Sequence, residues 1–256
     1  MAAHSVRALD ERYLRAIAEM AVEGEYRLHA HVAEQPREIE ECLAEHGKRP
    51  MEVLAECGLL GEHFTAVHAT HLEQHEAQLL GDAGSGVCVC PTTERNLGDG
   101  LPNLQDLMEL EVPLAIGSDS QARIDPLAEL RSLEDGERLR RGSRNCLVQA
   151  DGAVAPNLLV MGTAGGRRAS GLPTGGIEVG QRADLVAMDI SDPSLAGVQS
   201  GANSEEALLA ALVFAGGAAL VRDVWVGGRH VVEDGTMLRW DSTLEEYCRV
   251  VQKIWS

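Results

Sequence analysis

The sequence is poor in aromatic and in basic residues. Phenylalanine, tyrosine and tryptophan make up 3% of its 256 residues, and 22 Lys and Arg face 40 Asp and Glu. The formal net charge is −18 and no basic block interrupts it, which argues against a nucleic-acid partner because a phosphate backbone requires clustered cations. Few aromatic rings also means few surfaces on which a nucleobase could stack.

A long apolar run is also missing. The longest apolar stretch, residues 207–221, is interrupted by Gly216 and Gly217 and falls short of the roughly 20 residues that a membrane span needs. Met1 is followed by small and polar residues, unlike a secretory signal. We therefore expect no membrane partner and a cytoplasmic location, which suits the acidic net charge.

The six cysteines are scattered and include no CxxC pair. Cys88 and Cys90 alternate on one face of an apolar stretch, which predicts buried thiols. The sequence also lacks a GxGxxG or GKS/T loop, and this argues against a nucleotide-binding α/β fold.

Apolar stretches alternate with helical patterns over the first half of the chain. The predicted strands are residues 27–32, 64–69, 86–91 and 113–119. Helical patterns follow them at residues 37–46, 73–83, 103–111 and 126–141, with a polar loop directly after the third strand. Consecutive βα units with nearly continuous apolar strands predict an α/β fold with a parallel sheet, either a (β/α)₈ barrel or a doubly wound sheet.

The pattern changes after about residue 145. A helical segment at 155–169 precedes a short strand at 183–188, a hairpin turning at Gly227 and Gly228, and a closing helix at 244–255. We therefore predict two domains. Residues 1–145 form part of a barrel, and residues 146–256 contain its closing helices and a small β unit.

Three ionisable residues stand at the ends of different predicted strands. His31, His68 and Asp119 are good ligands for Zn²⁺ or Fe²⁺, and Glu34 follows His31 closely enough to act as a general acid or base. The carboxyl ends of parallel strands meet at one edge, so these side chains are expected to converge. The alternative is that each histidine is a hydrogen-bonded structural residue. His29 shares a strand face with His31 and is expected to lie deeper.

The motifs at these strand ends resemble those of the formimidoylglutamate deiminase family of metal-dependent amidohydrolases. The matching segments are HSVRA (4–8), HAHVAEQ (29–35), VHATH (67–71), CPTTERNLGDG (90–100), GSDS (117–120) and GQRADLV (180–186). The resemblance implies the C-terminal half of a (β/α)₈ TIM-type barrel, strands 5 to 8, with part of a small β-sandwich domain.

The resemblance also implies roles for the strand-end residues. His31 and Asp119 would bind one divalent metal, Zn²⁺ or alternatively Fe²⁺, and Asp119 would also accept a proton from the attacking water. His68 would orient that water. Glu34 would pass a proton to the departing nitrogen.

His4 and Arg7 match the residues that hold the two carboxylates of a small anionic substrate in that family. A guanidinium binds carboxylates in a bidentate manner, whereas the structural alternative for Arg7 is a solvated charge at a helix start. The implied reaction hydrolyses N-formimino-L-glutamate to N-formyl-L-glutamate and ammonia, a step of histidine degradation. A homodimer of the complete protein is compatible with the resemblance.

The sequence departs from the family pattern at its beginning. It opens just after the place where barrel strand 4 would end, so strands 1 to 4 and the HxH metal ligands of strand 1 are expected to be absent. Such a truncated chain is expected to bind zinc weakly, to lack activity and to self-associate. Two alternatives remain, namely an inactive remnant acting as a subunit and a deaminase of another cyclic amidine or a nucleobase.

Overall fold

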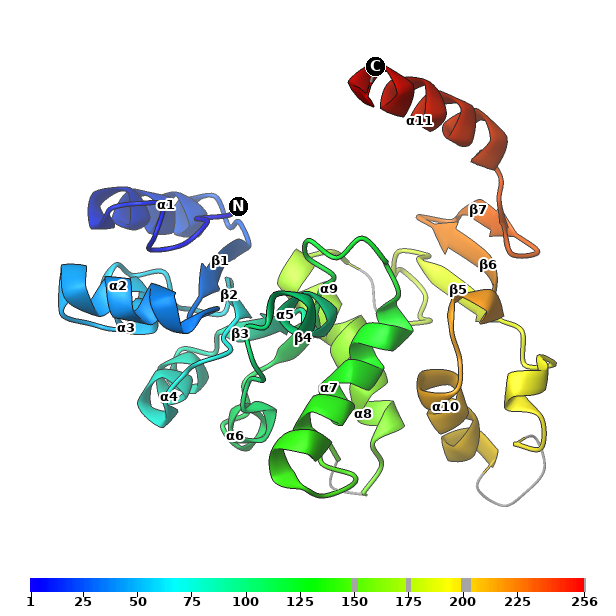
Figure 1. Ribbon diagram of the computed structural model, residues 1–256, viewed down its shortest axis with the longest axis horizontal. Coiled ribbons are helices and arrows are strands. Elements are labelled where there is room, and N and C mark those ends of the chain that lie inside the picture. The colour runs from blue at the N-terminus through cyan, green and yellow to red at the C-terminus, as the bar shows by residue number, and fades with distance from the viewer. Residues whose placement is uncertain (149–151, 174–175, 199–203, 256) are drawn as a thin grey trace. The chain divides into compact units, whose positions relative to one another are not determined.

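The computed structural model describes residues 1–148, 152–173, 176–198 and 204–255 of the chain (Figure 1). The chain divides into two compact units, Met1–Leu172 and Pro173–Ser256. Each unit has its own four-stranded sheet.

The first unit is built on a parallel sheet. Its strands are β1 (Leu28–Val32), β2 (Phe64–His68), β3 (Gly86–Val89) and β4 (Leu114–Ile116), hydrogen-bonded in the order β1-β2-β3-β4. The register places Ala30 beside Ala66, Ala66 beside Val87, and Val87 beside Leu114. The predicted parallel sheet is therefore confirmed, although β3 and β4 are shorter than the apolar stretches that predicted them.

One helix precedes β1, and the other helices follow the strands of this sheet. They are α1 (Glu11–Glu23), α2 (Pro36–His46), α3 (Pro50–Glu56), α4 (Gln74–Asp82), α5 (Pro91–Leu97), α6 (Leu104–Glu109) and α7 (Pro126–Arg141). Proline stands in the first turn of α2, α3, α5 and α7, where its missing N–H costs no helical hydrogen bond. Helix α5 corrects the sequence analysis, which placed a polar loop directly after β3.

One face of the sheet supplies much of the hydrophobic core. Along β1, Leu28, Ala30 and Val32 are buried, whereas His29 and His31 on the opposite face are partly exposed. Burying apolar side chains contributes roughly 25 cal/mol per Å² of apolar surface removed from water. This alternation places the imidazoles of His29 and His31 on the face opposite the buried apolar side chains.

The first unit also includes three short helical segments after residue 145. Helix α8 (Ala155–Val160), the π-helical turn η1 (Met161–Gly165) and helix α9 (Gly166–Ser170) pack with it and include close contact with β4. At Gly165 an added Cβ would lie 1.9 Å from the carbonyl oxygen of Leu114. These helices, which the sequence predicted as the closing helices of the barrel, pack against β4, and the first compact unit ends at Leu172.

The second unit contains an antiparallel sheet. Strands β5 (Leu185–Met188), β6 (Val221–Val226), β7 (Arg229–Glu233) and β8 (Thr236–Met237) follow one another in the order β5-β6-β7-β8. Gly227 and Gly228 both have positive φ values, 56° and 78°, as a tight two-residue hairpin turn requires. The predicted hairpin is thus confirmed.

Two longer helices belong to the second unit. They are α10 (Ser204–Phe214) and α11 (Trp240–Trp255), and short 3₁₀ turns lie at Pro193–Leu195 and Ala218–Leu220. None of the helices in the described part of the chain is both long enough and apolar enough to cross a membrane.

Candidate active site

Four of the predicted residues meet at the carboxyl edge of the parallel sheet. The rings of His31 and His68 stack with centroids 5.5 Å apart and an interplanar angle of 20°. His68 Nε2 lies 3.9 Å from Glu34 Oε1 and 4.0 Å from Asp119 Oδ2. Side chains of residues as far apart in the sequence as His31 and Asp119, 88 positions, therefore surround one small space, as expected for a shared edge of parallel strands.

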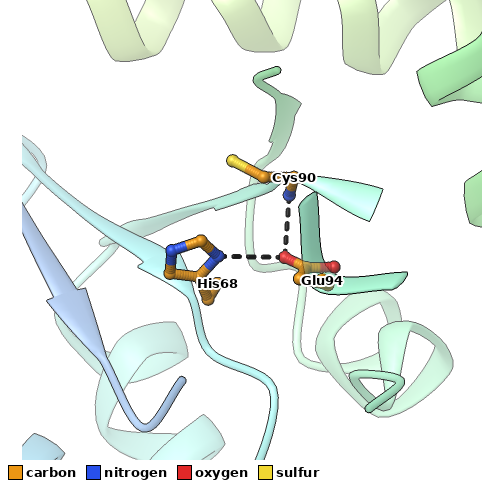
Figure 2. Close-up of side chains that lie close together, drawn as sticks. All are labelled: His68, Cys90 and Glu94. Carbon is orange, nitrogen blue, oxygen red and sulfur yellow. Dashed lines mark hydrogen bonds and ion pairs between the residues drawn. The ribbon is translucent and has the colours of Figure 1, made fainter. Parts of the chain in front are cut away.

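His68 is the centre of this group. Its side chain is 1% exposed, and Nδ1 lies 3.2 Å from Glu94 Oε1 (Figure 2). Within the part of the chain that the structure describes, His68 Nε2 is buried without a hydrogen-bond partner. Buried polar atoms are nearly always satisfied, so an unpartnered nitrogen facing two carboxylates indicates a place for a ligand or a water molecule.

Glu94 was not assigned a role from the sequence, although it lies in the polar group after the third strand. It stands in the first turn of α5, where Oε1 accepts a hydrogen bond of 2.8 Å from the backbone N–H of Cys90. This bond holds the Glu94 carboxylate next to the residue that follows β3, and in that position the carboxylate reaches His68. The position of Glu94, three residues after the end of the predicted apolar stretch 86–91, was the signal available in the sequence.

Burial and charge act in opposite directions on this pair. Burial raises the pKa of Glu94 above its usual value. Burial alone lowers the pKa of His68, but the hydrogen bond to Glu94 and the charges of Glu34, Glu94 and Asp119 outweigh it and leave that pKa raised. The imidazole is therefore set up to hold a proton among carboxylates.

The backbone is strained where these side chains leave the sheet. Ala33, His68, Ala69 and Asp119 have φ values of 50°, 70°, 55° and 49°, a left-handed conformation that non-glycine residues rarely adopt. Such conformations cost about 1–3 kcal/mol each and occur where the surrounding structure holds a functional group in place. At His68 and Asp119 they turn the chain directly at a predicted functional residue.

The N-terminal segment runs beside β1 and brings His4 to the same edge. Ala3 N–H donates to His29 O at 2.8 Å, and His31 N–H donates to His4 O at 2.6 Å. The His4 and His31 rings lie edge to face with centroids 5.2 Å apart. The structure therefore places His4 next to a predicted metal ligand.

Arg7 is paired with acidic residues of this site. Its guanidinium lies 2.9 Å from Glu34 Oε2 and 3.8 Å from Glu38 Oε2. Glu38 in turn accepts the backbone N–H groups of Ala33 and Glu34, and burial raises its pKa. The predicted substrate anchor and the predicted general acid or base are thus joined in one ion pair, which the sequence analysis did not anticipate.

His29 lies apart from the group around His68. Its Nε2 atom is 2.8 Å from the carbonyl oxygen of Ala169 in α9. The HAH pair consequently separates, with His31 at the edge of the sheet and His29 deeper, hydrogen-bonded to the covering helix.

Cys90 adds a sulfur to the surroundings of His68. Donor atoms of His68, Cys90 and Glu94 all lie within 4.8 Å of one another, and Cys90 is buried while Cys88 is partly exposed. The hydrogen bond between the two thiols lowers the pKa of Cys88 and raises that of Cys90. The prediction of buried thiols thus holds fully for Cys90.

The donors at the sheet edge fit a divalent metal ion. Imidazole nitrogen and carboxylate oxygen are standard ligands of Zn²⁺ and Fe²⁺. His31 and Asp119 supply one of each, and the unpartnered His68 Nε2 faces the same space. The residues present are therefore chemically suited to the metal that the sequence motifs predict.

Comparison with known proteins gives one family match and several relatives. The model of the amidohydrolase family matches residues 1–231. Formimidoylglutamate deiminase of Pseudomonas aeruginosa is 39% identical over 233 residues, covering 91% of this chain and 50% of that protein. The 5-methylthioadenosine/S-adenosylhomocysteine deaminase of Halobacterium salinarum is 35% identical over 195 residues, covering 75% of this chain and 44% of that protein.

Solved structures agree with the fold. An amidohydrolase from Brucella melitensis superimposes with a TM-score of 0.89 at 32% identity, covering all of this chain and 55% of the other. An adenosine deaminase from Xanthomonas campestris with bound zinc gives 0.87 at 26% identity, covering 98% and 56%. The chain spans about half the length of the curated relatives that it matches.

Proposed function

The chain belongs to the amidohydrolase family, and from that premise we propose that it forms part of the active site of a metal-dependent deiminase acting on N-formimino-L-glutamate. The observation that carries the proposal is the convergence of His31, His68 and Asp119 around the unpartnered His68 Nε2. The similarity to the Pseudomonas aeruginosa formimidoylglutamate deiminase supports the choice of substrate.

His31 and Asp119 would hold the metal, which we propose to be one Zn²⁺ ion, with Fe²⁺ as the alternative. When bound, such an ion acidifies water and polarises the group under attack. The zinc in the Xanthomonas campestris adenosine deaminase supports this choice. A catalytic zinc site uses about three protein ligands, so we propose that ligands beyond His31 and Asp119 complete the site in the whole protein.

In this proposal, different residues of the chain orient the water, accept its proton and protonate the leaving nitrogen. His68 Nε2 orients the attacking water, and Asp119 accepts a proton from it as the water oxygen attacks the formimino carbon. Glu34 delivers a proton to the formimino nitrogen, and the carbon–nitrogen bond breaks. One water is consumed, ammonia leaves, and N-formyl-L-glutamate remains.

His4 and Arg7 bind the substrate carboxylates in this proposal. Because Arg7 lies 2.9 Å from Glu34, an arriving carboxylate would compete with Glu34 for the guanidinium. Displaced from Arg7, Glu34 becomes available for proton transfer. Binding of an acidic substrate would thereby release the proton carrier that its own conversion requires.

A second candidate function is deamination of an adenine-containing nucleoside. It is favoured by the similarity to the Halobacterium salinarum 5-methylthioadenosine/S-adenosylhomocysteine deaminase. The low aromatic content and the position of Arg7 favour the acidic substrate instead. A third candidate is a catalytically inactive subunit.

The test is ammonia release by the complete gene product that contains this chain. We expect turnover of N-formimino-L-glutamate and little with 5′-methylthioadenosine, S-adenosylhomocysteine or adenosine. Arg7→Ala should raise KM for formiminoglutamate at least about tenfold, because a carboxylate loses its charge-assisted partner. Arg15→Ala is the matched control, since Arg15 pairs with Glu11 on the exposed side of α1.

If the protein turned over a nucleoside preferentially and Arg7→Ala left the kinetics unchanged, the proposed substrate would be wrong and the nucleoside would take its place. The absence of turnover with every substrate, in a folded product loaded with zinc, would favour the inactive subunit.

A further inference from the structure

A second group of metal-binding atoms lies beside the first. A ring nitrogen of His68, the thiol of Cys90 and a carboxylate oxygen of Glu94 lie within 4.8 Å of one another. All three side chains are buried, and Figure 2 shows them close together. The Nδ1 atom of His68 faces Glu94, whereas Nε2 faces Glu34 and Asp119. The imidazole therefore stands between two clusters.

A second sulfur lies next to this group. A Cβ added to Gly117 would meet Cys90 Sγ at 3.1 Å and Cys88 Sγ at 3.3 Å. Both thiols are thus packed over the same glycine at the start of the loop that carries Asp119. A side chain at residue 117 would fill the space that both sulfur atoms occupy.

The donor set differs in chemistry from that of the sheet edge. His31 and Asp119 offer nitrogen and oxygen, whereas Cys90 offers sulfur, which selects soft ions such as Zn²⁺ and Cd²⁺. Ligands at about 2.0–2.3 Å from a tetrahedral ion are roughly 3.5 Å from one another. His68 Nδ1 and Glu94 Oε1 already approach to 3.2 Å, so the remaining adjustment is a closure of about an ångström by the thiol.

We propose that His68, Cys90 and Glu94 form a binding site for one thiophilic divalent cation, cadmium or excess zinc, distinct from the ion assigned to His31 and Asp119. The thiol loses its proton as the ion binds. Cys88 is the neighbouring sulfur that can share the ion.

Occupation of this site would change the state of His68. A cation bound at Cys90 and Glu94 takes the ring nitrogen that now faces Glu94 and replaces the proton between them. This consequence rests on the proposed function, because the cation displaces the hydrogen bond to Glu94 that holds the ring in the orientation in which Nε2 faces the water. Cadmium, or zinc beyond one equivalent, would then inhibit the reaction. The binding itself does not depend on the proposed function.

The test is a titration of the purified 256-residue chain with Cd²⁺ after treatment with a chelator. Thiolate-to-cadmium charge transfer absorbs in the ultraviolet and reports sulfur ligation, so an ion held by His31 and Asp119 does not contribute. We expect the absorption to saturate with one sulfur-bound cadmium ion per chain, and an ion that first enters at His31 and Asp119 adds to the total bound without adding to this signal. Cys90→Ser should remove most of it, since only Cys88 then supplies a neighbouring sulfur, and Glu94→Gln should weaken the apparent affinity at least about tenfold.

Two control variants test whether the absorption comes from this site. Cys248→Ser removes an exposed thiol and should leave the absorption unchanged. Asp119→Asn should also retain it, because Asp119 belongs to the other cluster. An unchanged absorption in Cys90→Ser, or none in the wild-type chain, would overturn the proposal. Failure of the deiminase assay would leave these results untouched, so the two proposals fail separately.

Buried substitutions can unfold a chain, so a measurement on the wild-type protein accompanies them. In heteronuclear NMR spectra of the imidazole nitrogens, one equivalent of Cd²⁺ should shift the His68 signals in both wild type and Asp119→Asn. Unshifted His68 signals at saturation would equally refute the site.

Discussion

The imidazole of His68 and the carboxylate of Glu94 form a buried pair in which Nδ1 lies 3.2 Å from Oε1. The carboxylate is itself held by the backbone N–H of Cys90, the residue that follows β3. The orientation of the His68 ring therefore depends on the end of β3, although His68 itself belongs to β2. The opposite nitrogen then points at Glu34 and Asp119. A residue outside the predicted set thus orients the one at its centre.

Glu94→Gln tests that orientation, because the amide keeps the size of the side chain and removes its charge. In the complete gene product we expect kcat to fall about 10- to 100-fold with little change in KM. Glu94 raises the pKa of His68, so loss of the charge lowers that pKa and shifts the matching limb of the pH–rate profile to lower pH. The exposed Glu109→Gln serves as control. A wild-type profile in Glu94→Gln would remove Glu94 from the site.

Asp119→Asn separates metal binding and proton transfer from folding. The amide cannot accept the proton and binds a cation less strongly, so kcat in the complete gene product should fall at least about 100-fold. Zinc content, measured by mass spectrometry after dialysis, should fall as well. Asp82→Asn, a change at the end of α4 where Asp82 accepts from Gln78, should alter neither quantity. Normal turnover by Asp119→Asn would refute its assigned role.

Alanine substitutions at two adjacent glycines, Gly165 and Gly166, should change the free energy of unfolding in opposite directions. In Gly165→Ala the new Cβ would lie 1.9 Å from Leu114 O, which forces η1 away from β4 and should lower the free energy of unfolding by about 3 kcal/mol. Gly166→Ala meets no atom within 4 Å among the described residues and should raise it by up to about 1 kcal/mol through helix propensity. Urea denaturation of both variants measures the difference. Equal effects would show that η1 does not pack closely on β4.

Arg49 provides a prediction for the core of the first unit. Its Nε lies 2.6 Å from Glu76 Oε2, and its Nη1 lies 3.2 Å from Glu73 Oε1. Its Nη2 donates a hydrogen bond to the carbonyl oxygen of His71. Glu76 is completely buried, so Arg49→Ala leaves an uncompensated carboxylate and should cost about 3–5 kcal/mol. Arg37→Ala removes the exposed pair with Glu41 and should leave the denaturation midpoint unchanged. A similarly small effect of Arg49→Ala would mean that water reaches Glu76.

The sequence predicted those features that depend on local pattern. Apolar stretches located β1 to β4, and the alternation of elements predicted their parallel arrangement, which is enough to bring His31, His68 and Asp119 to one edge. The same reasoning could not find the Arg7–Glu34 ion pair, because a contact across 27 residues leaves no periodic signal.

Helix α5 was missed for a different reason. Its sequence, PTTERNL, contains threonine and asparagine, which are weak helix formers, so composition favours a loop. The helix is supported by its surroundings, since Thr92 bonds to Glu129 of α7 and Glu94 bonds to Cys90 and His68. Propensity could not reveal Glu94 because the tertiary structure overrides it.

The strand order β1-β2-β3-β4 has a consequence for synthesis on the ribosome. Each strand pairs with the one made directly before it, so the sheet can grow in the direction of translation without waiting for a distant segment. His31, His68, Glu94 and Asp119 would then enter the site in that sequence. The final carboxylate arrives last, and a nascent chain halted before β4 would carry the paired imidazoles and Glu94 without the charge of Asp119 beside them.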